Sequence, residues 1–137
     1  MSSSIDTCFE NLDKVQQVER LDNPCRTVVI VYSAWGLIEN GGFQYFFESN
    51  FPGDPSYDIF TQAFSSVGLT DIALDFSKLV SSFPFNEPHK FPGKRQEFID
   101  SQPSSFIALM AALEDRVFTH ENIEKTLDSF LRIADAS

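Results

Sequence analysis

The segment that decides the fold spans residues 38–50 and reads IENGGFQYFFESN. Within it an apolar stretch stops at Gly41–Gly42, and aromatic residues follow at once. Phe43, Phe46 and Phe47 are spaced i, i+3 and i+4, so on a helix they share one face. Glycine adopts positive φ without steric cost, which suits both a helix end and a sharp change of direction. We therefore predict a Gly-Gly corner between two apolar helices.

The apolar stretch before the corner is predicted to be the central helix, over residues 25–39. Asn23-Pro24 supplies a capping residue and then Pro at the first helical position. The β-branched residues at 27–31 are also typical of a buried strand. The apolar pattern continues through Trp35 and beyond, and this length favours a helix. A helix that is apolar on all sides belongs at the centre of a fold, with Trp35 inside.

Helical spacing of apolar residues recurs along the rest of the chain. It predicts helices over residues 4–20, after Asp54-Pro55, from Thr70-Asp71, after Pro103 and after a capping Thr119, with a short helical piece around Phe98 and Ile99. Residues 84–94 hold three prolines and one glycine, so we predict the longest loop there. The predicted fold class is all-α, a compact single-domain bundle of six or seven helices over residues 1–137.

The charge of the chain limits its partners. Twenty acidic residues stand against ten basic ones, which gives a net charge of −10. Phosphate contacts are made by Lys and Arg, so we expect no direct binding to nucleic acid. The same charge disfavours anionic membrane surfaces and favours basic proteins.

The N-terminus lacks the basic and apolar regions of a signal peptide, and the longest apolar run is too short to span a bilayer. Cys8 and Cys25 form neither a disulfide framework nor a Cys-x-x-Cys site. We therefore expect a cytoplasmic protein with reduced thiols.

The sequence offers no assembled set of catalytic or metal-binding residues. His89 and His120 each lack a second His or Cys at ligand spacing, so we expect no metal site. Cys25 lies near a helix N-terminus, where a thiol can be activated, but no histidine is near it in sequence. We expect no cofactor and no enzymatic activity.

Acidic residues gather on the first helix and on the last two. They are Asp6, Glu10, Asp13, Glu114, Asp115, Glu121, Glu124 and Asp128. One interpretation is a solvated surface, partly neutralised by i, i+4 pairs: Glu10 with Lys14, Glu121 with Lys125 and Asp128 with Arg132. The other is a negative face that binds a partner.

The corner carries a family resemblance. The residues concerned are Trp35, Glu39, Asn40, Gly41, Gly42, Phe43, the aromatics Tyr45, Phe46 and Phe47, and then Gly53 and Asp54. This pattern resembles the C-terminal-like domain of the DNA-mimic protein family over roughly residues 25–83. The chain departs from the family pattern at Tyr45, where the family often has Gln, and in its extra residues Phe51-Pro52. The resemblance implies an all-helical domain and no reaction, cofactor or catalytic residue. The family takes its name from a member that presents acidic helices to a DNA-binding protein in place of DNA.

Three functions follow from these observations. The first is a non-enzymatic acidic domain that binds a basic protein, either as a DNA mimic or as an inhibitor that masks a basic toxin. The second is a small-molecule or enzymatic site at the corner, built from Glu39, Asn40, Tyr45 and Asp54, because the corner is expected to bring Glu39, Asn40 and Asp54 near one surface. The third is a structural or oligomerisation module, with a homodimer as one expected state.

Overall fold

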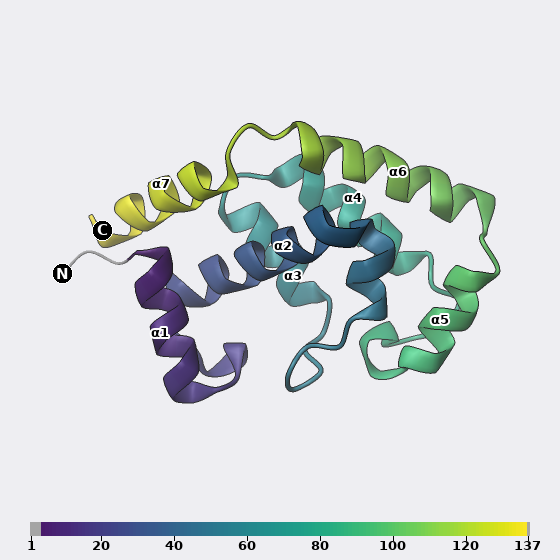
Figure 1. Cartoon of the computed structure of the whole chain (residues 1–137), viewed down its shortest axis with the longest axis horizontal. Helices are drawn as coiled ribbons and strands as arrows, with labels where there is room; N and C mark the ends of the chain where they lie inside the picture. Colours follow the sequence, from purple (N-terminus) through teal and green to yellow (C-terminus); the bar gives the residue numbers. More distant parts are fainter. Residues whose placement is uncertain (1–3, 137) are drawn as a thin grey trace.

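The computed structural model describes residues 4–136, and these residues form helices and no strand (Figure 1). The α-helices are α1 (Ile5–Val15), α2 (Cys25–Glu48), α3 (Asp58–Ser66), α4 (Thr70–Ser81), α5 (Pro92–Asp100), α6 (Ser104–Thr119) and α7 (Ile123–Asp135). Two 3₁₀ helices, η1 (Val18–Arg20) and η2 (Pro88–Lys90), lie between them. The predicted all-α class with six or seven helices is confirmed.

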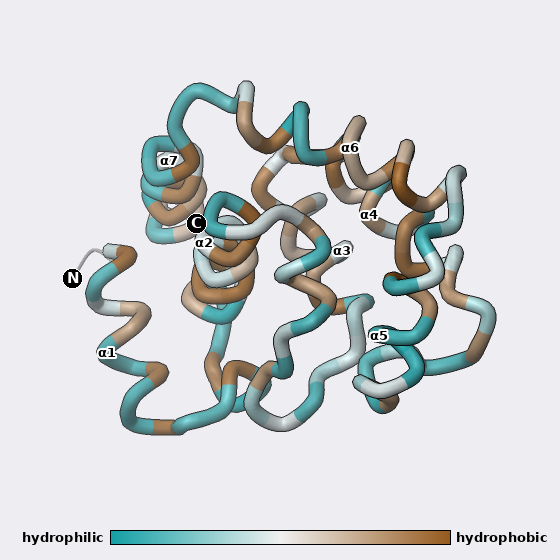
Figure 2. Tube along the Cα trace, turned by 45° about the vertical axis from the view of Figure 1, so that its right-hand side comes forward, coloured by the Kyte–Doolittle hydropathy of each residue, from teal (hydrophilic) through white to brown (hydrophobic). Residues whose placement is uncertain are grey.

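Helix α2 is the centre of the bundle. It contacts α1, α3, α5, α6 and α7. In Figure 1, α1 and α7 lie beside its first half, and α5 and α6 lie toward its end. Figure 2 shows α2 as predominantly hydrophobic, whereas α1 and α7 alternate between hydrophilic and hydrophobic residues. Trp35 is 3% exposed, so the predicted burial of this helix and of Trp35 is confirmed.

The core is built largely from phenylalanine rings. Phe43, Phe46 and Phe47 are fully buried, as their spacing predicts. The ring of Phe76 in α4 stacks on Phe47 at 6.0 Å, and Phe60 in α3 meets Phe46 edge-on at 5.1 Å. Burial of a phenylalanine contributes about 1.5–3 kcal/mol, and such ring pairs add about 0.5–1.5 kcal/mol. The aromatic segment after the corner therefore joins α2 to α3 and α4.

Three predicted helix boundaries are wrong. Pro24 is the N-cap residue of α2 and not its first helical residue, because α2 begins at Cys25. Helix α1 stops at Val15, not at residue 20, because Gln16 adopts a left-handed conformation at φ 66° and donates its N–H to Leu12 O. Thr119 does not cap α7: it is the last residue of α6, and its Oγ1 donates to the Asp115 carbonyl at 2.7 Å. The cap of α7 is Asn122, whose Oδ1 accepts from Lys125 N at 3.1 Å.

The prediction of reduced thiols is also wrong. Cys8 of α1 and Cys25 of α2 form a disulfide, with their Cα atoms 4.9 Å apart. Their separation of 17 residues matches no short motif, and only the packing of α1 against α2 brings the two sulfurs together. Because disulfides persist mainly in oxidising compartments, the expected cytoplasmic location loses the support of its thiol argument. None of the described helices is long and apolar enough to cross a membrane.

A buried arginine closes the end of α2. Arg95 of α5 is 1% exposed and donates to the carbonyls of Phe47 at 2.9 Å and Pro88 at 2.7 Å, and to Asn50 Oδ1 at 2.8 Å. Phe47 O lies in the last turn of α2, where a helix leaves its carbonyls unpaired and favours positive charge. The predicted loop 84–94 therefore folds as η2 and the start of α5 around this side chain.

Candidate protein-binding surface

The Gly-Gly corner interrupts α2 with two non-helical residues. Gly41 has φ −153° and ψ 17°, and Gly42 has φ 70° and ψ −171°. The positive φ expected of a glycine corner is therefore found at Gly42, in a region of backbone conformation that residues other than glycine hardly occupy. A side chain at either position would also displace its neighbours. A Cβ on Gly42 would collide with the Glu114 carboxylate, and a Cβ on Gly41 would lie 2.5 Å from Tyr45 Cβ.

Glu114 of α6 completes the corner. Its Oε1 accepts the backbone N–H of Phe43 at 2.8 Å. Phe43 begins the second helical segment of α2, whose first N–H groups have no partner within the helix. A carboxylate here satisfies one donor and interacts favourably with the helix dipole. Glu114 is half-buried and its carboxylate holds this corner, whereas the neighbouring Asp115 is exposed.

The other predicted corner residues separate into two groups. Glu39 and Asn40 are exposed and line a shallow hollow between the corner and α6. The exposed Asp54 and its neighbour Gly53 lie in the turn before α3 and do not line this hollow. The structure therefore brings Glu39 and Asn40 together but places Asp54 apart from them. Tyr45 is 45% exposed and follows the corner by one turn.

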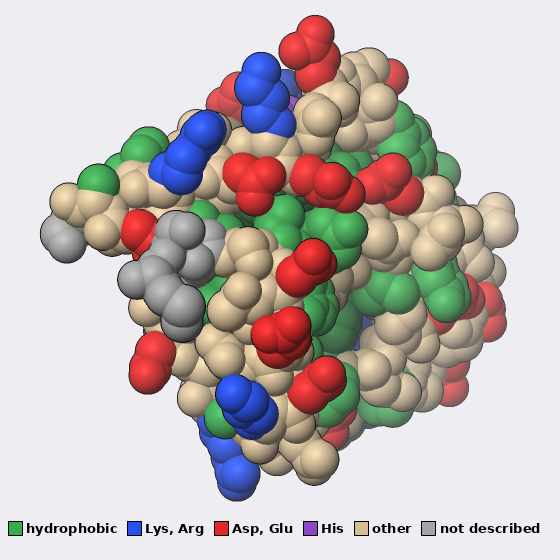
Figure 3. Space-filling model, turned by 60° about the vertical axis from the view of Figure 1, so that its left-hand side comes forward, with side chains coloured by type: hydrophobic (Ala, Val, Ile, Leu, Met, Phe, Trp, Pro, Cys, Tyr) green, Lys and Arg blue, Asp and Glu red, His purple; other side chains and the backbone are tan. Residues whose placement is uncertain are grey.

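The largest group of predicted acidic residues lies on α1, on α7 and in the turn just before α7. We call Asp6, Glu10, Asp13, Glu121, Glu124 and Asp128 the α1/α7 face. All six are exposed, and α1 contacts α7. Figure 3 shows this end of the molecule, with acidic side chains on both sides of a hydrophobic strip and basic side chains toward its edges. Acids that are distant in sequence thus share one surface.

Tyr32 of α2 lies within this surface. Its hydroxyl donates to Glu124 Oε1 at 3.2 Å, and its ring packs edge-on against Phe9 of α1 at 5.6 Å. Burial raises the pKa of the Tyr32 hydroxyl above its ordinary value, and the charge of Glu124, the hydrogen bond to it and the charges of Asp6 and Glu39 raise it further. Carboxylates from α1, α2 and the start of α7 therefore act on a single hydroxyl.

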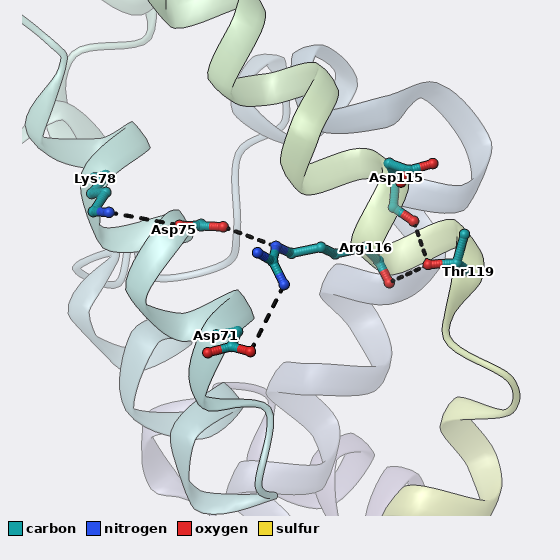
Figure 4. Close-up of polar contacts among 6 residues, drawn as sticks. All are labelled: Asp71, Asp75, Lys78, Asp115, Arg116 and Thr119. Atoms are coloured by element: carbon teal, nitrogen blue, oxygen red, sulfur yellow. Dashed lines mark hydrogen bonds and ion pairs between the residues drawn. The ribbon is translucent and has the colours of Figure 1, made fainter.

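The ion pairs of the described residues lie elsewhere. Figure 4 shows Arg116 of α6 reaching toward α4, where Nε lies 3.1 Å from Asp75 and Nη1 lies 3.8 Å from Asp71. Asp75 also pairs with Lys78 at 3.9 Å. The remaining pair is Lys90 with Glu87. None of the three predicted i, i+4 pairs forms, so within residues 4–136 no Lys or Arg pairs with a carboxylate of the α1/α7 face.

Three structural roles were not predicted from the sequence. Tyr32 carries no charge, so its place among the acidic residues could not be predicted from the charge pattern. Arg95 directly follows the predicted loop 84–94 and was given no role, although its place in a segment rich in Pro and Phe is a signal for burial. Glu114 was grouped with the surface acids, since its partner Phe43 is 71 residues away.

Within residues 4–136 there is no group of three or more His, Cys, Asp or Glu side chains placed to hold a metal ion. No curated protein and no solved structure matches the chain. Residues 19–134 match the family described as DMP19-like protein, and this span includes the corner, α6 and α7 but not α1. Since the match covers most of its length, the chain belongs to the DMP19-like protein family.

Proposed function

We propose that this chain is a non-enzymatic acidic protein that binds a basic protein through the α1/α7 face. The observation that carries the proposal is that six exposed carboxylates, on and beside the contacting helices α1 and α7, have no Lys or Arg partner within residues 4–136. Asp6, Glu39 and Glu124 come from different helical segments and all influence the Tyr32 hydroxyl. Like charges held together repel one another, and a cationic partner relieves that repulsion.

The family, whose matched residues 19–134 hold the α7 part of the face, supports a sharper form of the proposal in which the face mimics DNA. Duplex DNA carries about one charge per 1.7 Å of its axis. Carboxylates at i, i+3 or i+4 on one helix are about 5–6 Å apart, so a single helix presents too few charges. Two adjacent acidic helices reproduce the charge density of a row of phosphates better than one helix does. The partner is then a DNA-binding protein, or a toxin with a similarly basic surface, and the chain itself binds no nucleic acid.

The test compares charge reversals at equal net charge. One variant carries Asp6→Lys, Glu10→Lys and Asp13→Lys, and a second carries Glu121→Lys, Glu124→Lys and Asp128→Lys. A control carries Glu87→Lys, Glu97→Lys and Asp100→Lys near α5, at the opposite end of the molecule (Figure 1). Each protein is immobilised and exposed to a lysate of its native host, and captured proteins are identified by mass spectrometry.

We expect a basic protein that the wild type and the control capture and that both face variants lose. Raising the salt concentration should weaken its capture, because exposed charges are screened over about 10 Å at 0.1 M salt. Duplex DNA should compete with the chain for this protein if the DNA-mimic form is correct. Capture that is indifferent to salt and to both face variants would show that the acidity serves solubility alone.

A further inference from the structure

Two adjoining hollows lie between α2 and α6, and the second is also lined by residues of the α1/α7 face. One hollow is lined by Glu39 and the corner residues on one side and by Ile107, Ala111 and Phe118 of α6 on the other. A second hollow, lined by Trp35, Ile123 and Glu124 among others, shares Glu39 and Phe118 with the first. We call the two together the α2/α6 groove. Glu121 and Glu124 belong to both the groove and the α1/α7 face.

The wall formed by α6 carries apolar side chains that face solvent on either side of Glu114. Ile107, Ala111 and Phe118 are spaced i, i+4 and i+11, which places them on one stripe of the helix. Ile107 is 37% exposed and Phe118 is 55% exposed. The core of the bundle uses the adjacent side of α6, where Phe106, Leu113 and Val117 are buried. Helix α6 thus has exposed apolar side chains beside its core face that no described element covers.

Every formal charge that lines the groove is negative. The carboxylates are Glu39, Glu114, Glu121 and Glu124, and the only other ionisable lining group is His120. His120 Nε2 is hydrogen-bonded to Thr126 Oγ1 at 2.8 Å, and its ring packs on Trp35. No Lys or Arg of residues 4–136 lines either hollow. The groove therefore combines apolar anchoring points with a negative rim.

We infer that the α2/α6 groove binds an amphipathic basic helix of the partner protein. The inference rests on the proposed function and names the part of the partner protein that binds in the groove. Apolar side chains of that helix contact Ile107 and Phe118, and its Lys or Arg side chains approach Glu39, Glu121 and Glu124. The apolar stripe from residue 107 to residue 118 is about 16 Å long at ~1.5 Å per residue, which suits about three helical turns.

The fold favours a helix over an extended segment. A peptide that binds as a strand needs the exposed edge of a sheet, and residues 4–136 contain no strand. An amphipathic helix instead lays apolar residues at i, i+3, i+4 and i+7 into a hydrophobic groove. Charge complementarity excludes an acidic helix, because like charges would meet at Glu39 and Glu124.

The experiment uses synthetic helical peptides as probes for the whole chain. The first probe is about fourteen residues long, with Leu along one face and Arg on its flanks, and is labelled with a fluorophore. The second replaces each Arg with Glu, and the third replaces each Leu with Ser. We expect fluorescence anisotropy to report binding of the first probe only. Equal binding of the Glu probe or of the Ser probe, or no binding of the first probe, would overturn the inference.

Variants of the chain locate the binding site. Phe118→Ser and Glu39→Lys should each weaken the binding of the first probe tenfold or more. Leu74→Ser and Glu97→Lys are their controls, since Leu74 is 58% exposed on α4, Glu97 is exposed on α5 and neither lines the groove. The controls should bind like the wild type. All four changes are at exposed positions, and circular dichroism checks that each variant is folded.

The outcomes separate this inference from the proposed function. If Phe118→Ser binds the probe like the wild type while the Asp6, Glu10 and Asp13 reversals abolish capture of the basic protein, only the groove inference fails. If the wild type forms a concentration-dependent dimer that Phe118→Ser abolishes, a second copy occupies the groove and the inference is again overturned. Loss of both probe binding and capture in Phe118→Ser, with Leu74→Ser unaffected, supports the inference.

Discussion

The carboxylate of Glu114 accepts the backbone N–H of Phe43 at 2.8 Å and so joins α6 to the corner of α2 across 71 residues. The same carboxylate occupies the space that a side chain on Gly42 would need. The break in α2, the cap of its second segment and the contact between α2 and α6 therefore depend on one another. The corner also forms one wall of the α2/α6 groove, so its geometry determines where Glu39 lies relative to α6.

Gly42→Ala should destabilise the protein by more than about 1 kcal/mol, because alanine is strained at positive φ. The collision of its Cβ with Glu114 adds to that cost. Gly36→Ala is the matched control within α2, because a Cβ there meets nothing within 4 Å. Replacing that helical glycine should stabilise the protein by about 0.5–1 kcal/mol. Urea unfolding measures both, and equal stability of the two variants would contradict the assigned corner geometry.

Removing the Glu114 carboxylate that caps the second segment of α2 should also lower the stability of the protein. Glu114→Ala leaves the Phe43 N–H without its acceptor, and we expect a loss of about 1–2 kcal/mol. Glu114→Gln keeps an acceptor but loses the charge, so it should fall between Glu114→Ala and the wild type. Asp115→Ala is the control, since the Asp115 carboxylate is exposed and makes no such contact. Chemical denaturation ranks the variants, and a neutral Glu114→Ala would mean that the cap adds nothing.

The course of α2 could be predicted because its signals are local. Asn-Gly-Gly between apolar runs and the i, i+3, i+4 spacing of Phe43, Phe46 and Phe47 act within a few residues. What the sequence could not predict depends on contacts between distant segments. The hydrogen bond from Phe43 to Glu114 and the disulfide between Cys8 and Cys25 exist only once the helices pack.

The acidic surface likewise has one part that the sequence predicts and another part that depends on how the helices pack. Helical periodicity places Asp6, Glu10 and Asp13 on one face of the first helix, and this could be predicted from the sequence. The convergence with Glu124 at Tyr32 requires that α1 and α7 both lie against α2. The expected pairs at i, i+4 did not form, because exposed ion pairs gain too little energy to fix two long side chains.

Arg95→Met should be among the most destabilising substitutions in the chain. It leaves the buried carbonyls of Phe47 and Pro88 without their donor, at about 1–3 kcal/mol each, and removes the partner of the exposed Asn50 side chain. Arg95→Lys should recover little, because one ammonium group cannot reproduce the planar guanidinium. Lys94→Met is the control, since Lys94 is exposed. Calorimetry gives the melting temperatures, and equal values for Arg95→Met and Lys94→Met would refute this role.

Reduction of the disulfide should lower the stability by about 3 kcal/mol, the loop-closure value for a loop of roughly this length. The variant with Cys8→Ala and Cys25→Ala should be destabilised similarly and should not respond to reductant. Unfolding in urea with and without a reducing agent measures the effect. Alkylation of the native protein followed by mass spectrometry provides the independent check: two modified thiols without prior reduction would show that the bond does not form.

The stability of the protein should fall between about pH 10 and about pH 12 because of Tyr57. Burial, chiefly, raises the pKa of its hydroxyl from 10.0 to about 12, Arg95 opposes that rise, and Asp54 adds to it. Within this window the hydroxyl stays protonated in the folded state and ionises in the unfolded state, so unfolding releases a proton and becomes more favourable as the pH rises. The stabilisation that the protonated Tyr57 hydroxyl adds to the folded state is complete below about pH 10 and is lost by about pH 12. It amounts to about 3 kcal/mol in the free energy of unfolding.

Tyr57→Phe removes this titrating group and retains the buried ring, which is 3% exposed in the wild type. The urea-unfolding free energy of the variant should therefore fall less steeply over the same pH range. Ultraviolet absorbance of the folded wild type should show one phenol that ionises near pH 12, and this signal should be absent from the variant. Parallel stability curves for the two proteins would contradict the burial of an ionisable hydroxyl at this position.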